Sequence, residues 1–379
     1  MAGCVENINK DILRQCREQI GLSLSEVKKN IAKIAEIEQG EHKPTFNQLN
    51  TLAGLYNVPR WVFISDRLPE EYQFDKTIPA FRQLAESNAD VFSDNKVRTL
   101  TAKVESFRRL IIELHEDMGE PVPAFNPPQI NDNTTPDRAA HLVREWLNPS
   151  NEHNNFADWK KELEQKGIFV FMTDKFKGWS HVDRTLFRGL TIYHNSLPII
   201  IINDSDANKA QLFSLFHELG HLLRKESTVD DWEEPVHTIE RWCDELAGNV
   251  LMPAEQFLTV AENVGTDDLK AVKRIAKVFQ VSPYACLVRL KQLELIDWPI
   301  YKQLEAQLKA EYRRLQKKLK ESDSGLPRNR PREILHQYGQ VYTRAIFQAY
   351  HNKEIGIHKL CRLFNLKNPT YALDLEGYL

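Results

Sequence analysis

The segment Leu215–Lys225 reads LFHELGHLLRK and combines two kinds of residue that rarely share one helix. Its apolar residues recur at the spacing of an amphipathic helix that packs on a core. Three ionisable side chains, His217, Glu218 and His221, interrupt that pattern. Because residues four apart project from one face of a helix, the two histidines can bind the same metal ion. Glu218 beside them is placed to act as a base, and we expect the trio to line a cleft.

A second helix supplies the remaining candidates. It begins near His237 and reads IERWCDELAGNVLMP, with Pro253 at its end. Glu240 and Asp244 lie four apart on a stripe distinct from the apolar one. We expect Glu240 to be the third metal ligand, and Asp244 to accept a hydrogen bond from a ligating histidine and so fix its tautomer.

Two further expectations concern the neighbours of that stripe. Ala247 and Gly248 are small, which predicts that the two helices approach closely there. The other acidic residues of this segment are Glu233 and Glu234, in an expected loop, and Glu245, which points about 100° away from Asp244.

HELGH followed by Glu-x-x-x-Asp resembles the gluzincin metallopeptidases. Together with LPIIIIN at 197–203 and the Leu-Met-Pro at 251–253, it resembles the ImmA/IrrE family in particular, over roughly residues 78–295. The resemblance implies a zincin-like domain with one Zn²⁺ per chain, held by His217, His221 and Glu240, with Glu218 as general base. It also implies an intracellular endopeptidase that cleaves a helix-turn-helix repressor or antitoxin and so derepresses stress, mobile-element or toxin genes. For oxyanion stabilisation, His181 and His237 are candidates from position alone.

The expected fold is α+β and predominantly α-helical. Short β-branched and aromatic runs predict strands at 167–172, 187–193 and 197–203, the last buried on both faces, while residues 78–118 read as mostly helical. The Pro- and Asn-rich stretch 121–136 predicts a loop. We expect three parts: a helix-turn-helix domain at 1–70, the peptidase domain at 78–295 with a helix-turn-helix-like segment at 266–295, and C-terminal helices at 296–379.

The N-terminal part resembles a divergent Xre/Cro-type helix-turn-helix. Ser23 and Glu26 form a capping-box pattern, and Glu38, Gly40 and Pro44 match the family, although the spacing from Ser23 to Glu38 is shorter. Residues 1–66 hold eight Lys/Arg and eight Asp/Glu, whereas DNA-binding modules gain affinity by neutralising phosphates. Two interpretations stay open: DNA binding, or docking to another protein or to a second copy in a homodimer.

The remaining charge pattern leaves a second function open. Residues 301–332 hold ten Lys/Arg and four Asp/Glu, which suits a solvated helix face, nucleic acid or an acidic partner. The alternative function is therefore a DNA-binding or protein-binding transcriptional regulator of toxin–antitoxin type, with a latent or structural metal site.

Bulk composition narrows the setting of the protein. The net charge of −3 points to neither nucleic acid nor membrane. The five cysteines are scattered without a CxxC pair, which predicts a reducing cytoplasm. We find no secretory signal and no apolar run long enough to span a bilayer, so we expect no membrane partner.

Overall fold

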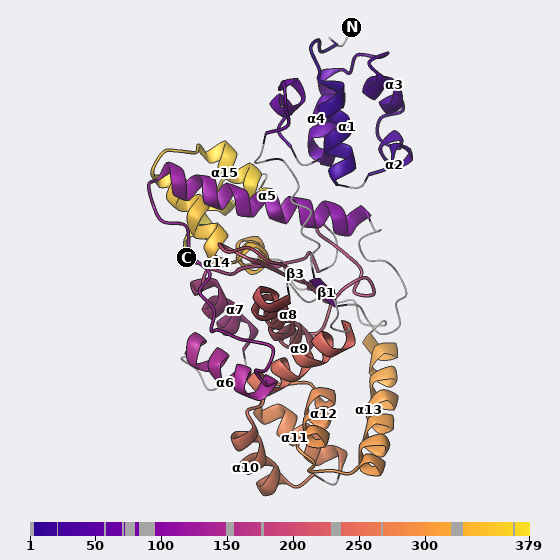
Figure 1. Ribbon diagram of the computed structural model, residues 1–379, viewed down its shortest axis with the longest axis vertical. Coiled ribbons are helices and arrows are strands. Elements are labelled where there is room, and N and C mark those ends of the chain that lie inside the picture. Colours follow the sequence, from indigo (N-terminus) through magenta and orange to yellow (C-terminus); the bar gives the residue numbers. More distant parts are fainter. Residues whose placement is uncertain are drawn as a thin grey trace.

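Helices dominate the chain, and one small sheet lies among them (Figure 1). This confirms the predicted α+β, mostly helical class. Among the described residues, no helix is both long and apolar enough to cross a membrane. The computed structural model describes residues 4–20, 22–56, 58–69, 72, 80–82, 95–148, 155–175, 178–228, 236–266, 268–319, 329–366 and 368–379.

The sheet of the described chain has the strand order β1-β3-β4-β2. Its strands are β1 (Ala80–Arg82), β2 (Phe169–Met172), β3 (Gly189–Ile192) and β4 (Ile199–Ile202). Strand β3 runs antiparallel to β1 and β4, while β2 runs parallel to β4. The last three strands confirm the predicted ones. The stretch 78–118, expected to be mostly helical, contains a helix at 95–117, whereas residues 80–82 form a strand because they pair with β3.

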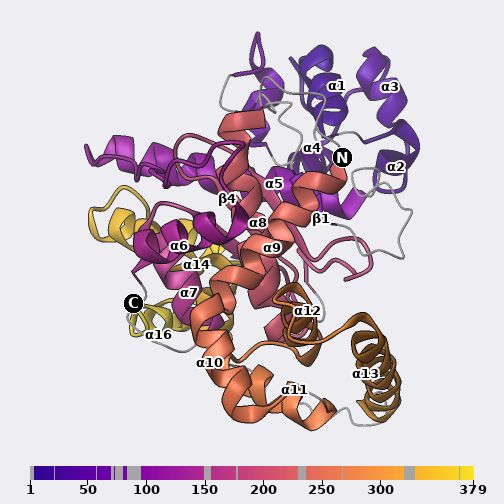
Figure 2. The same cartoon turned by 60° about the horizontal axis from the view of Figure 1, so that its bottom comes forward.

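Both faces of the sheet are covered, as the apolar run of β4 predicted. Alternate side chains of β2 and β4 enter two different cores. One core lies under α7 (Phe156–Gln165) and α8 (Asn208–Thr228), and the other under α5 (Asn95–Asp117) and α14 (Arg330–His351) (Figures 1 and 2). The sheet thus forms the middle layer, with α8 fixed against it.

The C-terminal helices belong to this layered core. Helix α14 packs on β2 and α5, and α15 (Ile357–Leu363) and α16 (Thr370–Glu376) pack beside it. The core on this side joins residues from Val97 to Ile201 with residues from Ile334 to Leu375. The segment after residue 329 therefore helps to bury the sheet that positions α8.

A buried ion pair of α7 holds a break in α14. At Gly339 the backbone has φ 74° and ψ 175°, a conformation that essentially only glycine adopts. On one side of the break, Glu164 Oε2 accepts a hydrogen bond from the Gln340 amide at 2.8 Å. On the other side, Lys160 Nζ donates to the His336 carbonyl at 2.5 Å. Burial raises the pKa of Glu164 to about 7 and lowers that of Lys160 to about 8.

The N-terminal helices form a separate core at one end of the molecule, to which Ala102 of α5 also contributes (Figure 1). The expected capping box is present, with Ser23 and Glu26 bonded to each other's backbone amides. Glu38 pairs with Arg17 at 2.7 Å inside this core. The elements are α1 (Lys10–Gln19), α2 (Leu24–Lys28), α3 (Ile34–Gln39), α4 (Phe46–Tyr56) and the 3₁₀ helix η1 (Arg60–Ile64).

At the end of the molecule opposite the N-terminal helices, α10 to α13 follow the helix that carries Glu240 and Asp244 (Figure 2). Ser282 caps α12 and Pro283 is its first residue, as predicted. Cys286, Leu287 and Leu290 of α12 are buried, and the helix contacts α11 and α13. The remaining helices are α6 (Pro136–Leu147), α9 (Val236–Leu251), α10 (Ala254–Val264), α11 (Leu269–Val278), α12 (Pro283–Gln292) and α13 (Trp298–Leu319).

Candidate metal centre

Helices α8 and α9 pack closely at the centre of the molecule (Figure 1). Gly220 of α8 lies directly against Cys243 of α9. A Cβ atom at Gly220 would lie 2.8 Å from Cys243 Sγ and 3.2 Å from its Cα. The expectation that Gly248 makes this contact is wrong, because a Cβ there would meet only Gln292 Oε1 at 3.9 Å. The glycine inside HELGH is therefore the residue that lets the helices approach.

This packing brings three of the predicted site residues together. His217 Nε2 lies 3.1 Å from His221 Nε2 and 3.2 Å from Glu240 Oε2. His221 Nε2 lies 3.4 Å from Glu240 Oε1. Two ring nitrogens and a carboxylate thus converge on one point, and in the described part of the chain no other group of His, Cys, Asp and Glu does so. The arrangement can hold one metal ion.

Asp244 lies on the other side of the His217 ring. Its Oδ1 is 2.9 Å from His217 Nδ1, as the four-residue spacing from Glu240 predicted. A carboxylate accepts this hydrogen bond, so Nδ1 carries the proton and the lone pair of Nε2 faces the cluster. Burial raises the pKa of Glu240, but the hydrogen bond with His217 and the positive charges that both histidines carry when they are protonated outweigh this and lower that pKa below its usual value.

Glu218 occupies a different environment, turned toward the sheet. Its side chain is fully buried, and Oε2 accepts a hydrogen bond from Thr191 Oγ1 of β3 at 2.8 Å. Gly189, two residues earlier on β3, packs against the same carboxyl group. Neither residue was singled out from the sequence. The signal in the sequence is a glycine and a threonine at alternate positions of the run 187–193, whose other residues are apolar except Arg188.

His217, Glu218 and His221 are more buried than the helical pattern of the sequence predicts. His217 and Glu218 have no exposed surface, and His221 is 8% exposed. The expected cleft is covered because α9 lies across the histidines and β3 lies against Glu218. On the α9 side the site is more exposed, because the side chains of Glu240 and Asp244 are 33% and 46% exposed.

The other candidates lie apart from this cluster. His181 Nδ1 is 2.9 Å from the Asp174 carbonyl oxygen, a contact that anchors the ring to its own loop. Glu245 pairs with Arg241 at 2.8 Å on the outer side of α9. The side chain of His237 and the residues Glu233 and Glu234 lie outside the described part.

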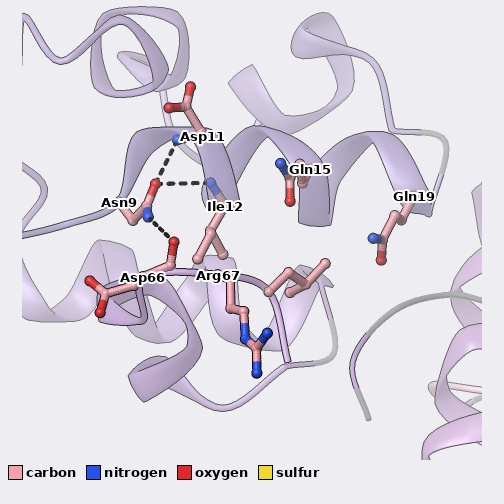
Figure 3. Close-up of a pocket in the computed structure, with 8 residues that line it drawn as sticks. Asn9, Asp11, Ile12, Gln15, Gln19, Asp66 and Arg67 are labelled. Carbon is pink, nitrogen blue, oxygen red and sulfur yellow. Dashed lines mark hydrogen bonds between the residues drawn. The ribbon is translucent and has the colours of Figure 1, made fainter. Parts of the chain in front are cut away.

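A separate hollow of about 500 Å³ lies on the N-terminal helices (Figure 3). Asn9 forms part of its wall, and its side chain is already bonded to the amides of Asp11 and Ile12 and to the Ser65 carbonyl. No residue of the metal cluster lines this hollow. It is therefore distinct from the candidate centre.

Comparison with known proteins shows which family part of the chain resembles. Residues 163–291 match the family model of the IrrE N-terminal-like domain, Peptidase_M78. The matched segment runs from α7 to α12 and includes all the clustered residues. It is shorter than the expected extent of 78–295, and it supports the resemblance to the ImmA/IrrE family. No curated protein matches the chain.

Proposed function

We propose that the chain is a zinc-dependent endopeptidase. The convergence of His217, His221 and Glu240 carries this proposal. In a tetrahedral zinc site with bonds of about 2.0 to 2.1 Å, the ligand atoms lie roughly 3.3 Å apart. The separations of 3.1, 3.2 and 3.4 Å match that geometry. Three protein ligands leave a fourth position for water, as catalytic zinc sites require.

The chain's own groups then have distinct tasks. Bound zinc would supply a coordinated water whose pKa is lowered toward neutrality, together with a positive charge for the oxyanion. Asp244 keeps the His217 ring in the ligating tautomer. Glu218 would take the proton of the water and return it to the leaving amine.

The proposed substrate is an intracellular helix-turn-helix regulator or antitoxin, whose cleavage would derepress the genes it controls. The family match supports a peptidase, and the resemblance to ImmA/IrrE proteins suggests this class of substrate. The N-terminal helices are then a candidate site for DNA, for the substrate or for a second copy of the chain.

The test is to co-express the protein with the regulator encoded beside it. We expect the regulator to be cleaved by the wild-type protein and by Glu255→Gln, a matched control on the exposed face of α10. Glu218→Gln is expected to retain zinc but to leave the regulator intact. His217→Ala is expected to lose both zinc and cleavage. An intact regulator under every inducing condition argues strongly against a protease.

The burial of His217 and Glu218 favours a second candidate, a regulator whose metal site is structural or latent. In that case Glu218→Gln leaves the biological phenotype unchanged. A protein that acts by sequestration instead forms a stable complex with the regulator, without proteolysis at saturating zinc. The same co-expression experiment therefore separates the three outcomes.

A further inference from the structure

We propose that Gly189 and Thr191 of β3 are positioning residues that hold the Glu218 carboxylate in one orientation. This inference rests on the proposed peptidase function, in which Glu218 is the general base. It implies that the site needs the sheet as well as the helices α8 and α9, because β3 orients the base.

Thr191 holds the Glu218 carboxylate by a hydrogen bond. Its hydroxyl is 2.8 Å from Glu218 Oε2 and 3.1 Å from the Glu218 carbonyl oxygen. A threonine hydroxyl can donate to either oxygen, and its shorter contact is with the carboxylate. Thr191 is only 2% exposed, so water does not compete freely for this bond. Hydrogen bonds to a charged group are stronger than those between two neutral groups.

Gly189 provides the space that the carboxyl group occupies. A Cβ atom built there would lie 2.6 Å from Glu218 Cγ and 2.8 Å from Cδ, closer than any van der Waals contact allows, and it would also overlap Oε1. Because residues two apart on a strand face the same side of a sheet, the empty position and the hydroxyl both face α8. Any larger residue at position 189 would displace the base.

The strand itself is held firmly. Gly189 pairs with Ile202 and Thr191 pairs with Ile200 of β4, and β1 pairs with the opposite edge of β3. A glutamate side chain has three rotatable bonds, and a misplacement of about 1 Å at a reacting group can lower the rate about 100-fold. A base bonded to an interior strand loses that freedom before substrate arrives.

The experiment compares three single variants in steady-state cleavage of the purified adjacent regulator. Thr191→Val keeps the shape of the side chain but removes the hydroxyl, so we expect kcat to fall about 10- to 100-fold with KM and zinc content unchanged. Thr191→Ser restores the hydroxyl and is expected to recover most of kcat. Thr101→Val is the matched control, because Thr101 is also 2% exposed but its hydroxyl donates to the Val97 carbonyl of its own helix, α5.

A further measurement does not depend on cleavage. A crystal structure of Gly189→Ala is expected to show the Glu218 carboxyl group displaced from β3.

The outcomes separate the two proposals. Full activity of Thr191→Val, or equal losses in Thr191→Val and Thr191→Ser, overturns the positioning role while leaving the peptidase standing. Full activity of Glu218→Gln overturns both proposals, since there is then no base to position. If the Glu218 carboxyl group has not moved in Gly189→Ala, the positioning role of Gly189 is also overturned.

Discussion

Gly220→Ala is expected to move the histidines of α8 away from Glu240 and Asp244 of α9. In an exposed helix interior, replacing glycine by alanine stabilises by about 1 kcal/mol. At Gly220 the new Cβ would lie 2.8 Å from Cys243 Sγ, 3.1 Å from its Cβ and 3.2 Å from its Cα. Two of these atoms are rigidly attached to α9, so the helix must move by roughly 0.5 Å to reach ordinary contact distances.

The cost follows from that movement. Overpacking of a core costs about 1 to 3 kcal/mol, which cancels the gain in helix propensity and leaves a net loss of about 1 kcal/mol. The movement also shifts Glu240 and Asp244 away from His217 and His221. Sites of this kind need their ligands held to within about 0.5 Å, so we expect zinc affinity to fall about 10- to 100-fold.

The assay is a chelator competition for zinc together with urea unfolding of the zinc-free protein. Gly248→Ala is the matched control on α9, because its Cβ meets nothing closer than 3.9 Å, and it is expected to bind zinc normally. Adding Cys243→Ala to Gly220→Ala removes the sulfur at 2.8 Å and is expected to recover part of the affinity. If Gly220→Ala binds zinc as tightly as Gly248→Ala, the packing argument is refuted.

The remaining predictions concern Asp244 and Glu164. Asp244→Asn replaces the carboxylate bonded to His217 by a weaker acceptor, so chelator competition is expected to give about tenfold lower zinc affinity with the ion still bound; unchanged affinity would contradict this. Burial raises the pKa of Glu164 from 4.5 to about 7 in the folded state, so the fold favours its protonated form. Urea unfolding of the wild type is therefore expected to lose stability as pH rises from about 4.5 to 7. Glu164→Gln is expected to lack this decline, and an equal decline would assign it to other groups.

The local features of this protein could be predicted from its sequence. The four-residue spacings of His217 with His221 and of Glu240 with Asp244 place each pair on one helix face, whatever the rest of the chain does. The Ser282-Pro283 start of α12 and the four-residue isoleucine strand β4 follow from equally local rules. Each of these features depends on residues a few positions apart, so the candidate ligands and three of the strands were predictable from the order of residues alone.

Contacts between distant segments were decided only by the tertiary structure. Gly220 and Gly248 are both glycines on facing helices, and only the docking angle of α8 and α9 determines which one makes the close contact. Thr191 contacts Glu218, which lies 27 residues later in the sequence, because the strand β3 packs against α8. The Lys160–Glu164 pair contacts the break in α14, which is much further away in the sequence. The same packing buries His217, Glu218 and His221, which helical periodicity alone predicts to line a cleft. Periodicity determines which face of an element a residue occupies, whereas the size and fit of the side chains between elements determine what that face meets.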